Sequence, residues 1–208
     1  MTTDQIFVKN DGTGIERALE IPDSFAQKTG IAGRDALHVR LLTEEMLGMV
    51  SAIAEEFSAN FWMEGDNSEC RLCLEAETIM NTEKRKGLLA ASSTGRNEAT
   101  KGVMGKIMEL VEVGMENYEE VNKLQMTYGG SPLNYGTMGM ESAEMSQAVL
   151  TWSLQQYRDS VSVQTDEDHA SEEAWDELEK SVVANLADDV RVGIKKDKVT
   201  IIIYKKFR

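Results

Sequence analysis

The pattern of hydrophobic positions predicts one long amphipathic helix in the first third of the chain. Between residues 34 and 57, apolar residues recur every three or four positions, which places them along one face of a helix. The residues of this stripe are Val39, Leu42, Met46, Val50, Ile53 and Phe57. At about 100° per residue, Glu45 falls at the edge of the stripe and Glu44 lies nearly opposite it. We therefore expect Glu45 to border the hydrophobic core.

Shorter segments have the composition and alternation of β-strands. The first, residues 5–9, is apolar and β-branched enough to form a short strand. Residues 60–64 and 70–75 are separated by a Gly-Asp-Asn-Ser turn, which predicts a hairpin. A second hairpin is expected at the end of the chain, where residues 190–194 alternate and residues 199–204 are apolar on both faces. These hairpins predict an antiparallel sheet.

Further helical patterns lie between and around these strands. A broken helical pattern, interrupted by Pro22, is expected over residues 15–29, and another helix begins near residue 101 with apolar residues at helical spacing. Residues 143–157 fit a helix by their length, although Leu150, Trp152 and Leu154 alternate as in a strand. Two acidic residues open a last helix, where they suit the helix dipole. Its predicted apolar stripe is Trp175, Leu178, Val182 and Leu186.

The order of these elements indicates an α+β fold. It predicts a two-layer sandwich, with helices packed on one face of a largely antiparallel mixed sheet. An irregular insertion at about residues 115–165 interrupts this order. Its first part is rich in Gly, Met and Tyr, and an acidic linker at residues 165–173 follows it. Long irregular segments in compact domains are often lids or partner surfaces. We expect a single domain over residues 1–208 that contains this insertion.

Composition and charge exclude several classes of function. The sequence has 22 Lys and Arg against 36 Asp and Glu, for a net charge of −14, so a nucleic acid would be repelled. No apolar run is long enough to span a membrane or to form a secretory core. Cys70 and Cys73 are three residues apart in a predicted strand, where they point to opposite faces and cannot form a disulfide. Reduced thiols fit the cytoplasm, where we expect the protein to act.

The residues of the commonest catalytic and metal sites are sparse. His38 and His169 are the only histidines, and the sequence contains no strained serine turn of the kind that hydrolase triads use. The acidic run at residues 166–168 lacks the spacing of a calcium loop. The sequence therefore predicts no metal site and no classical hydrolase.

One succession of motifs resembles a known family. The helix Arg40-Leu-Leu-Thr-Glu-Glu-Met-Leu-Gly-Met-Val50 is followed by a hairpin, a loop, the helix start Lys101-Gly-Val-Met-Gly-Lys-Ile107 and a terminal strand pair. This order resembles the histidine-kinase-like ATPase superfamily and, within it, the small anti-sigma-factor kinases. The resemblance covers residues 34–111 and the C-terminal hairpin, and it implies the same two-layer fold.

The resemblance assigns a catalytic role to Glu45. In that family the first helix carries a glutamate that activates water or a hydroxyl group, and an asparagine four residues later binds magnesium. Glu45 occupies the first of these positions and Met49 the second. A thioether is a poor ligand for a hard cation that requires oxygen donors. A magnesium site is therefore not expected, which argues against an active kinase or ATPase.

The resemblance also implies a site for ATP or ADP. Family members bind the adenine amino group with an aspartate after the second hairpin strand, where this chain offers Glu75, Glu77 and Thr78. Gly102 and Gly105 either leave room for a phosphate at a helix N-terminus or serve close packing of that helix against a neighbour. The basic residues that would neutralise the phosphates are Arg96, Lys101 and Lys106.

These observations leave three functions open. The first is a degenerate, non-catalytic or weakly nucleotide-binding regulatory protein that acts on a protein partner. The second is an interaction module of the same fold that binds no nucleotide, for which some of the twelve methionines would supply adaptable contacts. The third is an active anti-sigma-type serine kinase or an ATPase. The sequence does not indicate an oligomeric state.

Overall fold

The computed structural model consists of a six-stranded sheet with helices packed against it. The described residues are 1–52, 57–77, 150–164, 178–195 and 198–207, together with positions 103, 105, 107, 175 and 176. The strands are β1 (Ile6–Lys9), β2 (Ser58–Gly65), β3 (Glu69–Glu77), β4 (Leu150–Ser153), β5 (Asp189–Lys195) and β6 (Lys198–Lys206). The helices with described bounds are α1 (Ile15–Thr29), α2 (Gly33–Ala52), α7 (Leu154–Gln164) and α9 (Val182–Leu186).

The sheet is antiparallel at every described pairing. Its strands lie in the order β1-β2-β3-β6-β5-β4. Both predicted hairpins are confirmed, as β2 with β3 and as β5 with β6. They meet along β3 and β6 in the middle of the sheet, where Cys73 lies opposite Ile202. The α+β class with an antiparallel sheet is therefore confirmed.

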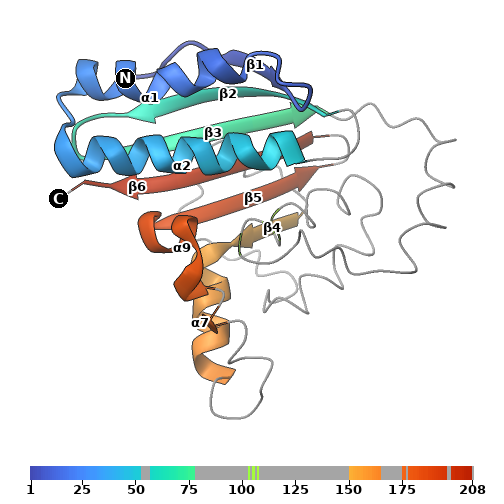
Figure 1. Ribbon diagram of the computed structural model, residues 1–208. Coiled ribbons are helices and arrows are strands. Elements are labelled where there is room, and N and C mark those ends of the chain that lie inside the picture. The colour runs from blue at the N-terminus through green and yellow to red at the C-terminus, as the bar shows by residue number, and fades with distance from the viewer. Residues whose placement is uncertain are drawn as a thin grey trace, which may run out of the picture.

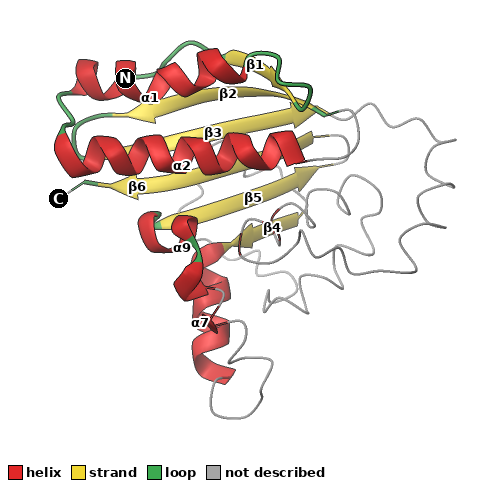
Figure 2. Cartoon of the chain, in the orientation of Figure 1, coloured by secondary structure: helices red, strands yellow, loops and turns green. Residues whose placement is uncertain are grey.

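The helices cover one face of this sheet. Figure 1 shows α1 and α2 side by side in front of the sheet, with α9 beside α2 on the side away from α1. Figure 2 shows the same two layers by secondary structure. Buried side chains of the helices and of the facing strand positions form one continuous core. Its largest members include Phe25, Leu42, Phe61 and Leu72, each of which stabilises the fold by about 1.5–3 kcal/mol through burial.

Helix α2 confirms the predicted amphipathic stripe. The first four stripe residues that it carries are completely buried: Val39, Leu42, Met46 and Val50. Phe57, the last residue of the predicted stripe, is 2% exposed but lies beyond the end of α2, directly before β2. The predicted stripe position 53 lies outside the described residues. The regular three- and four-residue spacing made this helix predictable, because it turns one face continuously towards the sheet.

Residues 150–153 do not belong to the helix that the sequence predicted. They form β4, in which Trp152 lies opposite Val192 of β5, and α7 begins directly after them at Leu154. The Ser153 hydroxyl accepts a hydrogen bond from the backbone N–H of Gln156 at 3.3 Å, as an N-cap residue does. The prediction over residues 143–157 was wrong here because a strand and a helix follow each other without a loop, so length was a misleading criterion.

The last predicted helix is divided at Ser181. The Ser181 hydroxyl accepts from the backbone N–H of Ala184 at 3.2 Å and begins α9 as a new helix. As a result, the predicted stripe is right for Leu178, which is buried, and for Leu186, which packs against the core, but wrong for its other two residues. Trp175 and Val182 are 38% and 41% exposed, whereas Val183 and Ala184 are buried. The helical phase changes at the serine cap, and the prediction had carried one phase through it.

None of the described helices covers the second face of the sheet. The buried side chains of these helices all belong to the main core, which lies against the first face. Trp62, Cys73 and Ile202 lie in register on this face, across β2, β3 and β6. Cys73 and Ile202 form a second small apolar cluster, with Trp62 and Tyr204 packed against it. We refer to this face of the sheet as the open face.

Candidate functional site

Glu45 lies on the flank of α2 that faces away from α1. The other flank is identified by Arg40, which pairs with Asp23 of α1 at 3.4 Å and with Glu44 at 3.1 Å. At about 100° per residue, Glu45 lies about 140° around α2 from Arg40. The Glu45 side chain is half-buried, so it borders the core as predicted. This flank faces the side of the sheet on which α9, β5 and β4 lie (Figure 1).

Met49, one turn further along α2, points into the hydrophobic core. Its side chain is 4% exposed and packs among the buried residues of the helix-facing side. A magnesium ion requires oxygen ligands in near-octahedral geometry, and a buried thioether supplies none. The residues present on α2 therefore do not fit a magnesium ion. Among the described residues, no cluster of three or more His, Cys, Asp or Glu side chains is placed to hold a metal ion.

The helix predicted to begin near residue 101 is described at three positions. Val103, Gly105 and Ile107 are helical and buried, and the two larger side chains belong to the main core. Burial of Gly105 agrees with close packing of this helix, and the phosphate alternative stays a prediction. Glu77 is the last residue of β3. Five further predicted nucleotide-binding residues lie outside the described part of the chain: Thr78, Arg96, Lys101, Gly102 and Lys106.

Glu75 lies on the open face of the sheet. Side chains alternate along β3: Leu74 belongs to the core under the helices, whereas Cys73 belongs to the cluster on the open face. Glu75 therefore shares the face of Cys73, and its carboxylate pairs with Lys198 Nζ of β6 at 3.2 Å. The structure thus places Glu45 and Glu75 on opposite sides of the sheet and does not bring them into one pocket.

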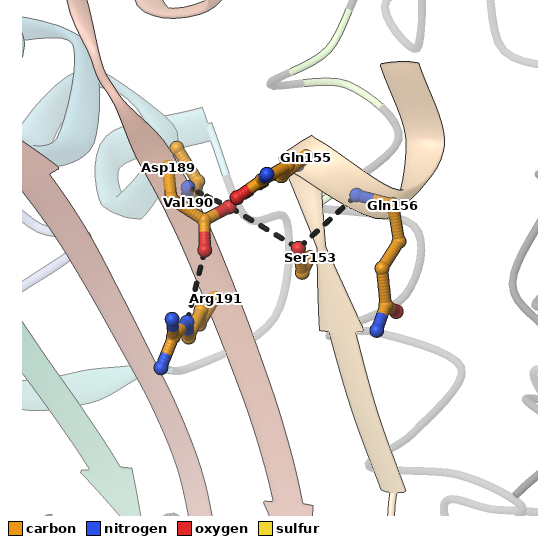
Figure 3. Close-up of polar contacts among 6 residues, drawn as sticks. All are labelled: Ser153, Gln155, Gln156, Asp189, Val190 and Arg191. Carbon is orange, nitrogen blue, oxygen red and sulfur yellow. Dashed lines mark hydrogen bonds and ion pairs between the residues drawn. The ribbon is translucent and has the colours of Figure 1, made fainter. Parts of the chain in front are cut away.

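Asp189, at the start of β5, organises a polar network that the sequence did not reveal. The residue is buried, at 7% exposure. One carboxylate oxygen accepts from the Ser153 hydroxyl at 3.2 Å and from the backbone N–H groups of Gln155 at 3.1 Å and Val190 at 2.9 Å. The other accepts from Arg191 Nε at 2.9 Å (Figure 3). The carboxylate thereby joins β5 to the first turn of α7, whose N–H groups lack helical partners.

Arg191 extends this network across the open face to Tyr204. Its guanidinium carbon lies 4.7 Å from the centre of the Tyr204 ring, and that of Arg71 lies at 5.9 Å, both within cation–π range. Burial raises the pKa of the Tyr204 phenol, and the two arginines partly oppose this effect. Tyr204 is therefore a neutral side chain in contact with two cations.

The indole N–H of Trp152 has no hydrogen-bond acceptor among the residues that the structure describes. This side chain lies on the helix-facing side of β4 and is 3% exposed. By contrast, the indole N–H groups of Trp62 and Trp175 each donate to a nearby glutamate, at 2.8 Å and 2.9 Å. A buried donor without an acceptor costs about 1–3 kcal/mol. An acceptor supplied by a water molecule or a ligand would recover that energy at this point of the fold.

His38 lies on α2 and is half-buried. Its Nε2 accepts from Arg34 Nε at 3.2 Å, while its buried Nδ1 has no partner within the described part of the chain. Burial lowers the pKa of His38 below its ordinary value, and Lys205 of β6 and Arg34 of α2 lower it further, against the opposing effect of Asp35. The imidazole is therefore neutral near neutral pH.

This depressed pKa predicts a loss of stability in mild acid. The unfolded chain binds a proton at His38 as the pH falls through its ordinary pKa of 6.5, before the folded chain does, so unfolding is favoured. We expect urea unfolding to give a smaller free energy at about pH 5 than at about pH 7, and His38→Gln to lose less over the same interval. Equal losses in the two proteins would show that His38 does not contribute.

The two cysteines lie on opposite faces of β3, as predicted, and are not joined by a disulfide. Burial raises the pKa of the Cys70 thiol to about 12, and Cys73 is 3% exposed. Because the thiolate is the reactive species, we expect neither thiol to react with an aromatic disulfide reagent in the native protein at neutral pH. Both should react after unfolding in guanidinium chloride. Rapid native labelling of either one would mean that β3 is more accessible than described.

Comparisons with known proteins give no identification. No protein-family model, no curated protein and no solved structure matches the chain. The fold therefore defines the protein only as an α+β protein with an antiparallel sheet. Within the described part of the chain, no helix combines the length and the apolar character needed to cross a bilayer. The resemblance to histidine-kinase-like ATPases stays a prediction.

Proposed function

We propose that the chain is a non-catalytic regulatory protein of histidine-kinase-like ATPase type that acts by binding a protein partner. In this proposal, any ATP, ADP or other anionic ligand binds weakly and without magnesium. Glu45 then borders a ligand site or a partner site on α2 but performs no phosphoryl transfer.

The observation that carries this proposal is the burial of Met49. Enzymes that transfer phosphoryl groups depend on metal ions to neutralise the charge that develops on the phosphate oxygens. The position one turn after Glu45 supplies a thioether that is 4% exposed within the core. Replacing it by an oxygen donor would leave a polar group among apolar side chains, which costs free energy. The packing of α2 thus leaves no oxygen donor at this position, which supports a binding role over catalysis.

Thermal denaturation with ATP or ADP, in magnesium and separately in EDTA, tests this proposal. A ligand that binds only the folded state stabilises it by about 2.7 kcal/mol at a hundred times its dissociation constant. We expect any increase in melting temperature to be equal with magnesium and with EDTA. A clearly larger increase with magnesium would argue for an intact metal site and against the proposal.

Two variants of α2 locate the ligand. If phosphates lie against the Glu45 flank, Glu45→Gln should increase the ligand-induced shift, because a like charge is removed. Glu44→Gln is the matched control, since Glu44 lies on the flank that faces α1 and pairs with Arg40. Equal responses of the two variants would place any nucleotide elsewhere.

An interaction module without a nucleotide site is the second candidate. The position of Glu75 favours it, because this candidate adenine acceptor pairs with Lys198 on the open face, on the other side of the sheet from Glu45. In that case neither nucleotide should change the melting temperature at saturating concentration. The same titration therefore separates the two candidates.

A further inference from the structure

Both ring nitrogens of His38 favour the neutral imidazole. Nε2 accepts a hydrogen bond from Arg34 Nε at 3.2 Å, so the single proton of the neutral ring is assigned to Nδ1. Nδ1 is buried and has no partner among the residues that the structure describes. Protonation would turn Nε2 into a donor that faces the Nε–H group of Arg34, and it would charge a ring whose buried nitrogen lacks an acceptor. The observed position of the ring therefore disfavours the imidazolium.

The surroundings of His38 also oppose a positive charge. Besides burial, Lys205 of β6 and Arg34 of α2 act against protonation, and Asp35 of α2 acts in its favour. The Lys205 side chain is 15% exposed, and its Nζ pairs with Asp188 at 3.9 Å. At about 100° per residue, His38 lies nearly opposite the flank of α2 that faces α1. Helix α9, which lies on this side of α2 (Figure 1), has no titratable side chain.

Cys70 lies on the helix-facing side of the sheet at the same end. It is opposite Lys205 in the pairing of β3 with β6 and is 1% exposed. Lys205 acts electrostatically on both Cys70 and His38, which places the three side chains near one another under the start of α2. Cys73 lies on the opposite face of β3 and is 3% exposed. The two thiols therefore separate an opening on the helix-facing side from a loosening of the whole strand.

Asp35 offers a second position to the His38 ring. Residues three and four apart are neighbours on a helix surface, and Asp35 and Arg34 precede His38 by these intervals. A neutral imidazole can accept from Arg34, whereas an imidazolium donates at both nitrogens and requires an acceptor such as the Asp35 carboxylate. The protonation state of His38 therefore selects between two neighbours on its own helix.

We propose that His38 is a proton-dependent latch at the start of α2, which covers Cys70 when the imidazole is neutral and turns towards Asp35 when it is protonated. The inference goes beyond the proposed function and uses none of its ligand residues. The closed latch binds one proton fewer than the open one, so a fall in pH favours opening. The neutral ring stabilises the closed form above the ordinary pKa of 6.5, and this stabilisation is lost as the pH falls below that value.

Thiol labelling of the full chain tests the latch. A pyridyl disulfide still reacts with thiols in mild acid, and mass spectrometry of peptides separates Cys70 from Cys73. Each labelling rate is divided by the rate for the unfolded chain at the same pH, which removes the intrinsic pH dependence of the thiols. Between about pH 7 and about pH 5.5, we expect the relative rate to rise about tenfold at Cys70, because the protonated fraction of a histidine rises steeply over this interval. The relative rate at Cys73 should stay constant.

Variants of α2 tie the effect to His38. His38→Gln keeps a hydrogen-bond acceptor but cannot bind a proton, so the relative rate at Cys70 should no longer depend on pH. Asp35→Asn removes the acceptor of the imidazolium and should reduce the rise. Asp23→Asn is the matched control, since it removes an exposed carboxylate that pairs with Arg40 on the other flank of α2, and it should leave the rise unchanged.

Other outcomes decide against the latch. An unchanged relative rate at Cys70, an equal rise at Cys73, or the same rise in His38→Gln would overturn it. The two thiols are compared within the wild-type chain, so this comparison stays decisive if His38→Gln fails to fold. A nucleotide effect on stability, or its absence, bears on the proposed function alone and leaves the labelling result unaffected.

Discussion

Replacing Asp189 by alanine should lower the free energy of unfolding by about 3 kcal/mol. The substitution removes the acceptor of four hydrogen bonds, two of which fix the first turn of α7 to β5. The four lost bonds cost about 1 kcal/mol each, and removing a buried carboxylate recovers part of this because its desolvation cost is removed as well, which leaves a net loss of about 3 kcal/mol. Urea unfolding followed by far-UV circular dichroism should give a lower midpoint with an unchanged slope.

Two further substitutions make this prediction specific. Asp189→Asn keeps one acceptor oxygen for Ser153, Gln155 and Val190 but cannot accept from Arg191 as a carboxylate does, so we expect a loss of about 1–2 kcal/mol. Asp176→Ala removes an exposed ion pair with Lys180 and should change stability by less than about 0.5 kcal/mol. If Asp189→Ala were as mild as Asp176→Ala, the network in Figure 3 would not hold α7.

Replacing Gly14 by alanine should also destabilise the protein by about 3 kcal/mol. Gly14 precedes α1 with a φ of 77°, in the left-handed region where a side chain costs about 1 kcal/mol or more. A Cβ atom here would lie 1.9 Å from the carbonyl oxygen of Phe7 in β1. The Phe7 oxygen is a backbone atom and the added Cβ atom is bonded to the backbone, so neither can move aside alone. The substitution therefore forces β1 and the start of α1 apart. Thermal and urea unfolding measure this effect.

Two other glycines serve as controls for Gly14. Gly12 also has a positive φ, 94°, but a Cβ atom added there would meet no other atom within 4 Å, so Gly12→Ala should cost only about 1 kcal/mol. Gly48 lies within α2 with open space around it, and Gly48→Ala should stabilise the protein by up to about 1 kcal/mol. Equal effects of Gly12→Ala and Gly14→Ala would disprove the close approach of β1 to α1.

The elements that the sequence predicted correctly are those in which one face is buried along their whole length. Helix α2 repeats its apolar residues without interruption, and Val39, Leu42 and Met46 are completely buried. The two hairpins were predictable because turn residues separate their strands. The ends of the helical pattern over residues 15–29 match those of α1, but α1 continues through Pro22, at which the prediction had placed an interruption.

The errors in the fold arose where one element follows another without turn residues. Ser153 both ends β4 and caps α7, and Ser181 caps α9 within a predicted helix. A serine hydroxyl forms such caps through local hydrogen bonds, so these positions carried a signal in the sequence. The apolar periodicity that runs across Ser153 and Ser181 was a stronger signal than the serine caps. The predicted helices therefore ran through both serines with one phase.

The candidate site was less predictable than the fold. The alternation of Leu72 and Leu74 already indicates that Glu75 occupies the other face of β3, so this placement was available from the pattern. The Asp189 network was not, because its partners Ser153 and Gln155 are 36 and 34 residues away. Only the sheet pairing of β4 with β5 brings them together.

The release of phosphate from ATP in the presence of magnesium tests the central claim most directly. If the packing of Met49 in the core has removed the metal site, the purified chain should release phosphate no faster than a buffer blank, and Glu45→Ala should behave identically. Magnesium-dependent release that Glu45→Ala abolishes and Glu44→Ala leaves intact would contradict the account, since Glu45 would then act as a catalytic base.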